Sequence, residues 1–221
     1  MRENIRQENR DHHRLFYKTD HHWKAETGLW AAGIIAQYLN ANNGFNIDVG
    51  LFDPERYRYD VYEGSNLGSL GRKVTLIRAH ADDGVLIYPE FDTDLSMLTL
   101  AGNIERQGTF GVTYKNKPIH KPNYYTSFYD WEYSIGNEVI HNNLLHDGKK
   151  ILFIMDSFFK TVTPFLALGV ENIAAIDLRG FTGSLKTYIK QNKPDMVIVM
   201  YNPSIIKTPD YTVHTSMFDF R

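Results

Sequence analysis

The chain has 221 residues, of which 43% are hydrophobic and 23% charged, and its formal net charge is −2. This size suffices for one ordinary hydrophobic core with room for a subdomain. The small negative charge, without a basic patch, argues against nucleic-acid binding. The absence of cysteine excludes disulfides and thiol catalysis. No apolar run reaches the roughly 18 residues that cross a bilayer, and residues 1–10 are too polar for a signal peptide.

Residues 1–14 are mostly charged, and we expect a frayed or helical lead-in there. Directly afterwards a carboxylate, two imidazoles and an indole follow one another at Asp20, His21, His22 and Trp23. Residues i and i+2 of an extended segment point the same way, so Asp20 can orient and charge-stabilise His22. A turn would also bring the two together.

A helix is predicted directly after this motif. Apolar residues follow helical spacing over 24–40, and the polar and glycine residues at 40–44 stop the pattern. Asp20 could instead cap this helix. Trp23 is expected to pack beside the histidines, and His21 receives no catalytic role.

Residues 45–147 change character, because short alternating runs are punctuated by Gly, Asp and Asn. We expect modest strands at 74–77, 84–88 and 109–114. Residues 64–72 are rich in glycine and serine and are predicted to be a flexible loop, either structural or at the rim of a site. The aromatic stretch 124–133 could line a substrate groove or pack this region onto the rest of the protein.

From residue 148 the pattern becomes α/β. Apolar strands are predicted at 151–155, 173–176 and 196–200. A helical segment is predicted after the first strand, with Pro164 kinking it or starting a new turn, and a helix is predicted at 184–192. This alternation implies right-handed parallel crossovers.

Three polar residues follow the ends of the predicted parallel strands, and ligands bind beyond the carboxyl ends of such strands. These residues are Ser157, Arg179 and Asn202. The sequence therefore predicts that they share one edge of the sheet.

Acyl transfer by serine needs a nucleophile, a base, a group that orients the base, and oxyanion donors. His22 can take the Ser157 proton, and Asp20 can hold the imidazole in the right tautomer. The Ser157 amide can donate to the oxyanion, and a second donor can come from the backbone near Gly180 or from the Asn202 side chain. Asp-Ser after a strand can also be a mere helix cap, and Asn202 a turn residue before a proline.

A metal site is the main alternative. Two Asp-His-His blocks stand at 11–13 and 20–22, and histidine and carboxylate are good zinc ligands. Their spacing fits none of the usual zinc motifs. Because a triad explains His22 without an ion, we expect neither a metal nor another cofactor.

Two motifs carry a resemblance to a known family. The Thr-Asp-His-His-Trp motif at 19–23 resembles the signature of the bacterial DHHW proteins. Together with Met-Asp-Ser-Phe at 155–158 it is similar to the SGNH-hydrolase-like domains of alginate O-acetyltransferases, which carry an Asp-x-His pair upstream of the serine. Ordinary SGNH esterases carry this pair at the C-terminal end and a glycine at the place of Met155, so the motif order here looks circularly permuted. The resemblance is strong over 15–40 and 149–205.

The resemblance implies a three-layer α/β/α, SGNH-hydrolase-like (flavodoxin-like) fold with a parallel sheet. We expect one domain over 1–221, with a β-rich insert at 45–147 and an α/β part at 148–205 that carries the nucleophile. In this family pattern Asn202 stands at the place of the oxyanion asparagine, and Gly180 less clearly at that of the glycine. Arg179 and Tyr201 are counterparts of the arginine and aromatic residues that help the acetyltransferases, and Trp23 joins the substrate-binding set.

The resemblance also implies a function. We expect serine-dependent O-acetyl transfer, through an acyl-enzyme, to a cell-surface or exported polysaccharide. A membrane-bound O-acyltransferase would supply the acetyl groups, and the chain would be the extracytoplasmic part of a membrane-anchored or exported protein. The alternatives are a carbohydrate esterase, in which water replaces the sugar hydroxyl, and a non-catalytic polysaccharide-binding module.

Overall fold

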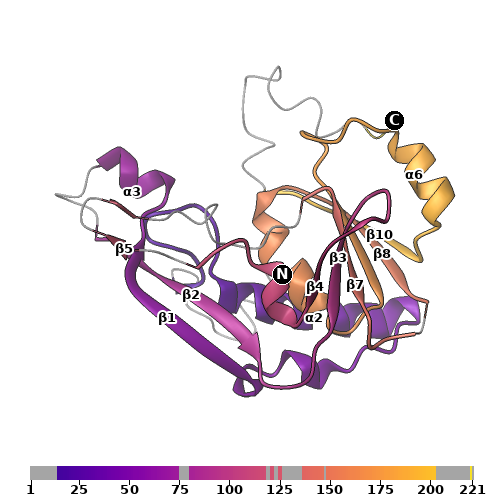
Figure 1. Ribbon diagram of the computed structural model, residues 1–221, viewed down its shortest axis with the longest axis horizontal. Coiled ribbons are helices and arrows are strands. Elements are labelled where there is room, and N and C mark those ends of the chain that lie inside the picture. Colours follow the sequence, from indigo (N-terminus) through magenta and orange to yellow (C-terminus); the bar gives the residue numbers. More distant parts are fainter. Residues whose placement is uncertain are drawn as a thin grey trace. The chain divides into compact units, whose positions relative to one another are not determined.

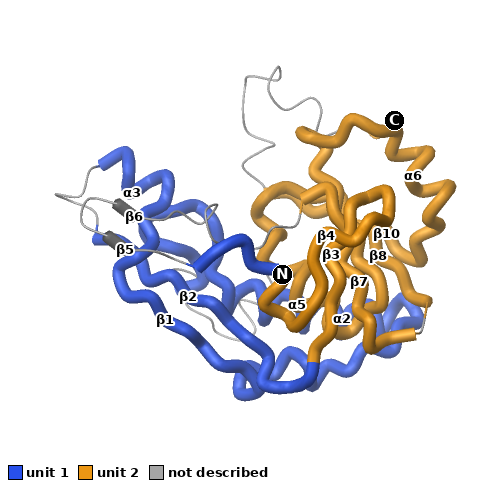
Figure 2. Tube along the Cα trace, in the orientation of Figure 1, with its two compact units in different colours: residues 1–92, 113–134 blue, residues 93–112, 135–221 orange. Residues whose placement is uncertain are grey.

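The computed structural model describes residues 14–74, 80–117, 120–121, 124–125, 136–146, 148–202 and 220. The chain divides into two compact units, each built from separate stretches of chain. One contains Met1–Asp92 and Thr113–Ser134, and the other contains Thr93–Val112 and Ile135–Arg221 (Figure 2).

The first unit combines one long helix with an antiparallel ribbon (Figure 1). β1 and β2 pair antiparallel, with an irregularity between Tyr62 and Asn66. In chain order the elements are α2 (Ala25–Asn43), η2 (Val49–Phe52), η3 (Pro54–Arg56), β1 (Tyr57–Asn66), α3 (Ser69–Val74), β2 (Asp82–Pro89), β5 (His120–Lys121) and β6 (Tyr124–Tyr125).

Helix α2 confirms the helical pattern of the sequence. It ends where Gly44 adopts a left-handed conformation, with φ of 66°, and its N–H donates to the Leu39 carbonyl. The apolar positions that define the predicted stripe are all buried, namely Ala25, Leu29, Ala32, Ala36 and Leu39. The helical spacing of the apolar residues therefore predicted the buried face of the helix correctly.

The second unit is built on a six-stranded sheet of order β10-β8-β9-β7-β3-β4 (Figure 1). Its elements are β3 (Leu95–Thr99), β4 (Ile104–Gly108), η4 (Phe110–Thr113), β7 (Glu138–Asn142), β8 (Lys150–Met155), η5 (Ser157–Thr161), α5 (Thr163–Leu166), β9 (Asn172–Ile176), α6 (Leu185–Asn192) and β10 (Met196–Met200). The last residue of η4, Thr113, is counted with the first unit. β8 is parallel to both β9 and β10. The three predicted α/β strands are confirmed, in the parallel arrangement that the sequence implied.

The predicted parallel sheet is confirmed only in part, because the sheet is mixed. β7 pairs antiparallel with β9, β3 with β7, and β4 with β3. These three strands come from the stretch 95–142, and of the three pairs only β3 and β4 are joined by a short connection of the hairpin kind, which favours antiparallel pairing. The α/β class is correct, while the three-layer arrangement and the domain boundaries at 45–147 and 148–205 stay predictions.

A core cluster on one face of the sheet joins β8 and β9 to α6. Leu152 and Ile154 of β8 lie beside Ala174 and Ile176 of β9, and Leu185 of α6 packs onto them. Strand β8 is buried on both faces from its second residue to its last. A strand buried on both faces needs a continuous apolar run, which is the pattern that its sequence shows.

Three local predictions are corrected by the structure. Val74 ends helix α3 instead of starting a strand, and 75–79 lie outside the described residues. The predicted strand at 109–114 is the 3-10 helix η4. The predicted flexible loop at 64–72 is largely regular, because β1 runs to Asn66 and α3 begins at Ser69. Serine and glycine mark a strand end and a helix start here, and composition alone does not separate these from a loop.

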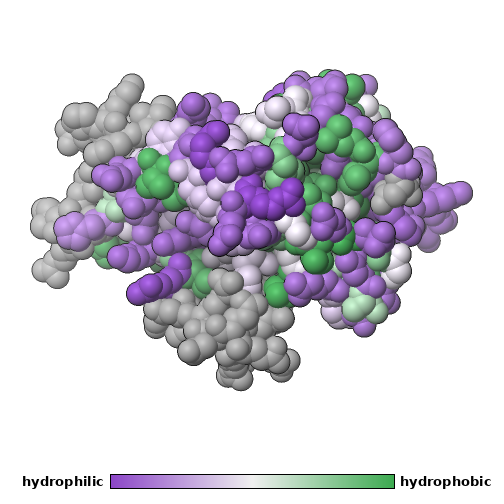
Figure 3. Space-filling model, turned by 90° about the horizontal axis from the view of Figure 1, so that it is seen from below, coloured by the Kyte–Doolittle hydropathy of each residue, from purple (hydrophilic) through white to green (hydrophobic). Residues whose placement is uncertain are grey.

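Apolar side chains also reach the surface of the protein. Val197 and Val199 of β10, an outer strand in the sheet order, are 38% and 51% exposed. Figure 3 shows one face of the molecule, on which hydrophobic side chains lie among hydrophilic ones. Such a mixture is ordinary for a protein surface. Within the described ranges, no helix combines the length and the apolar character that a bilayer crossing requires.

Candidate active site

The Asp-His motif lies in a narrow loop that is closed by backbone hydrogen bonds. Phe16 and Trp23 form an antiparallel bridge. The Tyr17 amide donates to the His22 carbonyl, at 3.1 Å, and the Lys24 amide donates to the Leu15 carbonyl, at 2.9 Å. The chain therefore doubles back around residues 18–21, and a turn, not an extended segment, brings Asp20 and His22 together.

Asp20 and His22 are joined by a short hydrogen bond. Nδ1 of His22 lies 2.5 Å from Oδ1 of Asp20, and the same oxygen accepts the His22 backbone N–H, at 3.0 Å. Both side chains are almost completely buried. An ionised carboxylate can only accept, so the imidazole donates from Nδ1 and, when neutral, carries its basic lone pair on Nε2. This is the tautomer that a general base oriented by a carboxylate requires.

The start of helix α3 clamps the other side of Asp20. The Ser69 amide donates to Oδ2 of Asp20, at 2.8 Å. The amides of Leu70 and Gly71 both donate to the Thr19 carbonyl, at 2.9 Å. The Gly68 amide donates to Oγ1 of Thr19, at 3.0 Å. Residues 68–71 therefore hold the backbone and the side chain of the motif with four N–H groups.

A buried carboxylate completes this clamp. Oδ2 of Asp82 accepts from the amide and the hydroxyl of Thr19, at 2.8 and 2.6 Å, and Oδ1 accepts from the Lys18 amide, at 3.0 Å. Asp82 is the first residue of β2, so the ribbon fixes the motif from another direction. Asp20 thus receives a rigid frame from two elements that are distant in sequence.

Gly68 is at a position where a side chain does not fit. A Cβ atom there would lie 2.3 Å from Cβ of Asp20 and 2.4 Å from its Oδ2. A Cβ on Gly71 would lie 2.8 Å from Cβ of Thr19. The glycines of this segment therefore allow close approach of backbone to the Asp-His motif.

The pKa of Asp20 is shifted by opposing effects. Burial raises it, because the charged form loses solvent, but the hydrogen bonds from His22 and from the Ser69 amide lower it. The charge interaction with His22 adds to the lowering. The net pKa lies well below the usual range of an aspartate, so Asp20 is ionised at neutral pH.

A metal site at the motif fits the geometry poorly. Asp20, His21 and His22 each offer a ligand atom within 4.8 Å of the others. However, both oxygens of Asp20 already accept hydrogen bonds, and Nδ1 of His22 faces Asp20. His21 is 46% exposed, with its Nδ1 at 3.4 Å from the Ser69 hydroxyl. The other Asp-His-His block, at 11–13, lies outside the described residues.

Ser157 lies at the carboxyl end of β8, as predicted. It is the first residue of η5, and its 9% exposure makes it largely buried. The segment after it is a 3-10 helix, and α5 begins at Thr163 with Pro164 in its first turn. Pro164 therefore starts a new turn, one of the two predicted outcomes.

Asp156 is the N-cap of η5 and makes a second contact. Its Oδ1 accepts the Phe158 amide, at 2.9 Å, and its Oδ2 accepts the Asn202 amide, at 2.8 Å. The sequence allowed Asp-Ser to be a mere helix cap, and the cap is present. Only one of the two carboxylate oxygens makes it, because the other accepts the Asn202 amide just after β10. Asn202 thus lies at the same edge of the sheet as Ser157.

Arg179 lies in the turn after β9 and forms a fork with Asp177. Its Nε and Nη2 donate to the two carboxylate oxygens, at 2.9 and 2.6 Å. The amide of Arg179 donates to the Asp177 side chain, and the amide of Gly180 donates to the Asp177 carbonyl, both at 3.0 Å. The Gly180 amide is therefore engaged within this turn.

Charged and aromatic groups gather at this edge. Burial raises the pKa of Tyr201 to about 12, and the charges of Asp177 and Asp156 add to the effect. Burial also raises the pKa of Asp156, against the two amide hydrogen bonds and the charge of Arg179, which lower it. The predicted convergence of polar groups at the carboxyl ends of β8, β9 and β10 is therefore present.

The predicted residues thus form two groups. Asp20, His22 and Trp23 belong to the first unit, and Trp23 is only 4% exposed, as the packing interpretation expects. The other five lie in the second unit: Ser157, Arg179, Gly180, Tyr201 and Asn202. The approach of His22 to Ser157 stays a prediction. Of the aromatic stretch 124–133, only the backbone of β6 belongs to the described residues.

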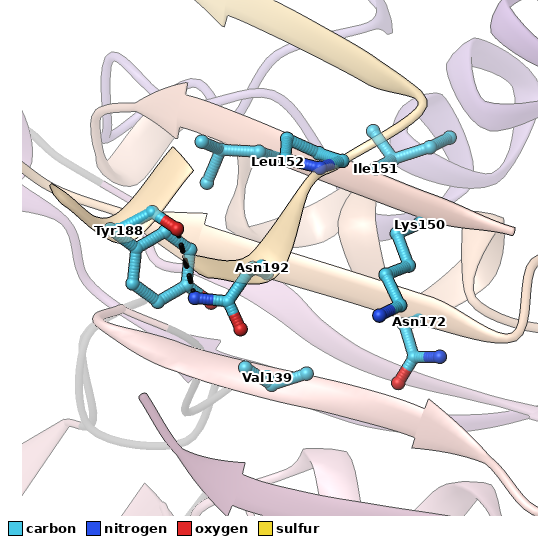
Figure 4. Close-up of a pocket in the computed structure, with 9 residues that line it drawn as sticks. Val139, Lys150, Ile151, Leu152, Asn172, Tyr188 and Asn192 are labelled. Atoms are coloured by element: carbon cyan, nitrogen blue, oxygen red, sulfur yellow. Dashed lines mark hydrogen bonds between the residues drawn. The ribbon is translucent and has the colours of Figure 1, made fainter. Parts of the chain in front are cut away.

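A small pocket of about 100 Å³ lies at the opposite edge of the sheet (Figure 4). Lys150 and Asn172, the first residues of β8 and β9, line it together with Tyr188 and Asn192 of α6. The Asn192 side chain is held by a hydrogen bond to the Tyr188 carbonyl, at 3.0 Å. Ser157 and Arg179 follow the other ends of the same strands, so this pocket is separate from the candidate site.

Sequence reasoning missed the supporting residues of both groups. Asp82 and the amides of 68–71 hold Thr19 and Asp20, and the Asp156 carboxylate accepts from the Asn202 amide just after β10. The one available signal was the pair Gly68 and Gly71, whose glycines mark close backbone approach. Nothing in the sequence indicated which segment they approach.

No protein-family model and no curated protein matches the chain. Among solved structures, Bacillus cereus PatB1 aligns with a TM-score of 0.74 at 21% identity, over 99% of this chain and 70% of its own. The structure of PatB1 with a sulfonyl adduct aligns with a TM-score of 0.69 at 19% identity, over 99% of this chain and 69% of that one.

A DHHW family protein from Eubacterium siraeum aligns with a TM-score of 0.62 at 17% identity, over 85% of this chain. The chain spans 59% of the length of that protein. At these identities the likeness concerns the fold. The expected resemblance to DHHW proteins is confirmed at this level.

Proposed function

We propose that this protein transfers acetyl groups to hydroxyls of a polysaccharide through an acyl-enzyme on Ser157. The observation that carries the proposal is the buried Asp20–His22 pair, which has the geometry and the tautomer of an oriented general base. The placement of Ser157 at a strand end beside polar groups, and the likeness in fold to a DHHW family protein and to PatB1, support it.

The proposed first half-reaction forms the acyl-enzyme. Oγ of Ser157 attacks the acetyl carbonyl carbon of the donor while Nε2 of His22 takes the hydroxyl proton. The bond from the carbonyl carbon to the donor oxygen then breaks, and His22 returns the proton to this leaving group. Asp20 stabilises the imidazolium between the two events. The proposal requires that the two units bring Nε2 of His22 within hydrogen-bond reach of Oγ of Ser157.

The second half-reaction resolves the acyl-enzyme. A sugar hydroxyl attacks the carbonyl carbon, His22 takes its proton, and the Ser157 oxygen leaves and is reprotonated by His22. The Ser157 amide and the Asn202 side chain are the proposed oxyanion donors. Arg179 and Tyr201 are proposed to contact the substrate. No cofactor enters either step.

The acceptor and the donor system follow from the resemblance of the motifs to the alginate O-acetyltransferases. We infer a cell-surface or exported polysaccharide as acceptor and a membrane-bound O-acyltransferase as the source of acetyl groups. The protein would then work outside the cytoplasm, as the soluble part of an anchored or exported protein. An esterase shares the acyl-enzyme and differs only in that water resolves it.

The test compares hydrolysis with transfer. With p-nitrophenyl acetate we expect slow hydrolysis that Ser157→Ala abolishes and His22→Ala nearly abolishes. Adding an acceptor oligosaccharide should give acetylated sugar by mass spectrometry and, where deacylation limits the rate, faster release of p-nitrophenol.

The alternatives predict different results. If a panel of oligosaccharides is never acetylated while their acetylated forms are efficiently deacetylated, the protein is an esterase. If Ser157→Ala retains full ester turnover, both enzyme functions fail and a polysaccharide-binding module remains.

A further inference from the structure

One carboxylate ties together the ends of two neighbouring strands at the nucleophile. Met155 and Met200, the last residues of β8 and β10, are register partners in the parallel pair. Asp156 follows the first strand directly, and Asn202 stands two residues after the second. The side chain of Asp156 spans the gap with its two hydrogen bonds, to the amides of Phe158 and Asn202.

We infer that Asp156 is a positioning residue, which holds Asn202 at a fixed place beside the turn of Ser157. This inference rests on the proposed function, in which the Asn202 side chain stabilises the oxyanion. A donor of this kind works only when it is held where the charge develops. The bond from Oδ2 of Asp156 to the Asn202 backbone fixes the origin of that side chain.

Capping η5 does not account for this arrangement. An N-cap needs one acceptor oxygen, and serine, asparagine and aspartate serve about equally well. Asp156 instead uses two oxygens in two directions, and only an ionised carboxylate among these side chains accepts with both. The second oxygen, the one that a cap does not require, is the one that holds Asn202.

Burial of Asp156 disfavours the charged form of its carboxylate. Asp156 is 3% exposed, and burial raises its pKa. The two amides and the positive charge of Arg179 oppose this effect, while the negative charge of Asp177 adds to it. A neutral side chain would cap η5 without this cost. The hydrogen bond from the Asn202 amide is the largest of the effects that favour the charged form, so the geometry ties this carboxylate to Asn202.

Asp156→Ser separates the two contacts. The serine hydroxyl can still accept the Phe158 amide as a cap, but it is too short to hold the Asn202 amide as well. We expect kcat/KM for p-nitrophenyl acetate to fall by about 10²-fold, as for a displaced transition-state donor. Asp48→Ser is the matched control, because Asp48 caps the 3-10 helix η2 through the Gly50 amide and should change nothing.

A double-mutant cycle with Asn202→Ala tests whether Asp156 acts through Asn202. If it does, Asp156→Ser adds little once the Asn202 side chain is gone. Hydrogen exchange of the Asn202 amide gives a readout without activity, and we expect at least tenfold faster exchange in Asp156→Ser. Equal losses of kcat/KM in both backgrounds, or unchanged protection of the Asn202 amide, would overturn the inference. Full ester turnover by Ser157→Ala would instead refute the proposed function. The hydrogen-exchange measurement would then still show whether Asp156 holds the Asn202 amide.

Discussion

Nδ1 of His22 and Oδ1 of Asp20 lie 2.5 Å apart, and both side chains are almost fully buried. The bond belongs to a turn that runs from Tyr17 to Trp23, and the Ser69 amide of α3 holds the other oxygen of Asp20. A base oriented in this way is pre-organised, because neither the ring orientation nor the tautomer has to be selected during the reaction.

Asp20→Asn should remove most of the activity. A carboxamide has one acceptor oxygen, whereas Asp20 accepts from His22 Nδ1, the His22 amide and the Ser69 amide. We expect kcat/KM for a small acetyl ester to fall by about 10³-fold or more, because the wrong tautomer becomes favoured. The control is Asp83→Asn, since Asp83 binds only the Gly64 amide among the hydrogen bonds described for it. Equal effects of the two changes would contradict the assigned role.

Gly68→Ala should disturb the Asp-His motif although it leaves the side chains of Asp20 and His22 unchanged. The new Cβ would overlap Asp20, so the clamp or the motif must shift. We expect a loss of about 1–3 kcal/mol in the free energy of unfolding, measured with denaturant, together with lower esterase activity. Gly136→Ala is the control, because its Cβ would meet only the end of Lys160, at 3.5 Å. A Gly68→Ala protein as stable and active as the control would refute the clamp.

Asp20 and Asp156 should affect stability with opposite pH dependence. The pKa of Asp20 is lowered by folding, so its stabilisation is present above the unfolded pKa of about 3.9 and is lost as pH falls below it. The pKa of Asp156 is raised, so its contribution is largest at low pH and is lost as pH rises through the folded pKa.

These pH dependences are measured by unfolding with denaturant between pH 3 and 7. The free energy of unfolding of the unsubstituted protein is compared with that of Asp20→Asn and, separately, with that of Asp156→Asn. Relative to its variant, the unsubstituted protein should lose stability on acidification in the first comparison and gain it in the second. Slopes of the same sign would show that at least one of the two environments is wrongly described.

Chelation should leave esterase activity intact, because both oxygens of Asp20 are engaged by N–H groups. His21→Ala is a companion test, since His21 is a ligand in the metal alternative and has no role in the triad. We expect its kcat/KM to stay within about threefold, the range of an ordinary surface change. Loss of activity with chelator, and its return with zinc, would favour the metal site.

The sequence predicted the α/β part of the fold because apolar runs such as 151–155 and 196–200 report burial directly. It placed Ser157, Arg179 and Asn202 at one edge for the same reason. The predictions for 64–74 were wrong, because the local structure there depends on contacts with Thr19 and Asp20, about 50 positions away in the sequence. The sequence also missed the antiparallel half of the sheet, since strand direction depends on tertiary pairing and leaves no local pattern.

The most direct test of the central claim is covalent labelling of Ser157 by a small sulfonyl fluoride, followed by peptide mass spectrometry. If Ser157 is the nucleophile and His22 its base, the sulfonyl group should appear on Ser157 and slow ester hydrolysis to the same extent. His22→Ala should reduce the labelling rate by at least 10²-fold, because an unassisted serine hydroxyl is a weak nucleophile. Labelling of Ser157 at an unchanged rate in His22→Ala, or complete loss of hydrolysis with the label on another residue, would contradict the account.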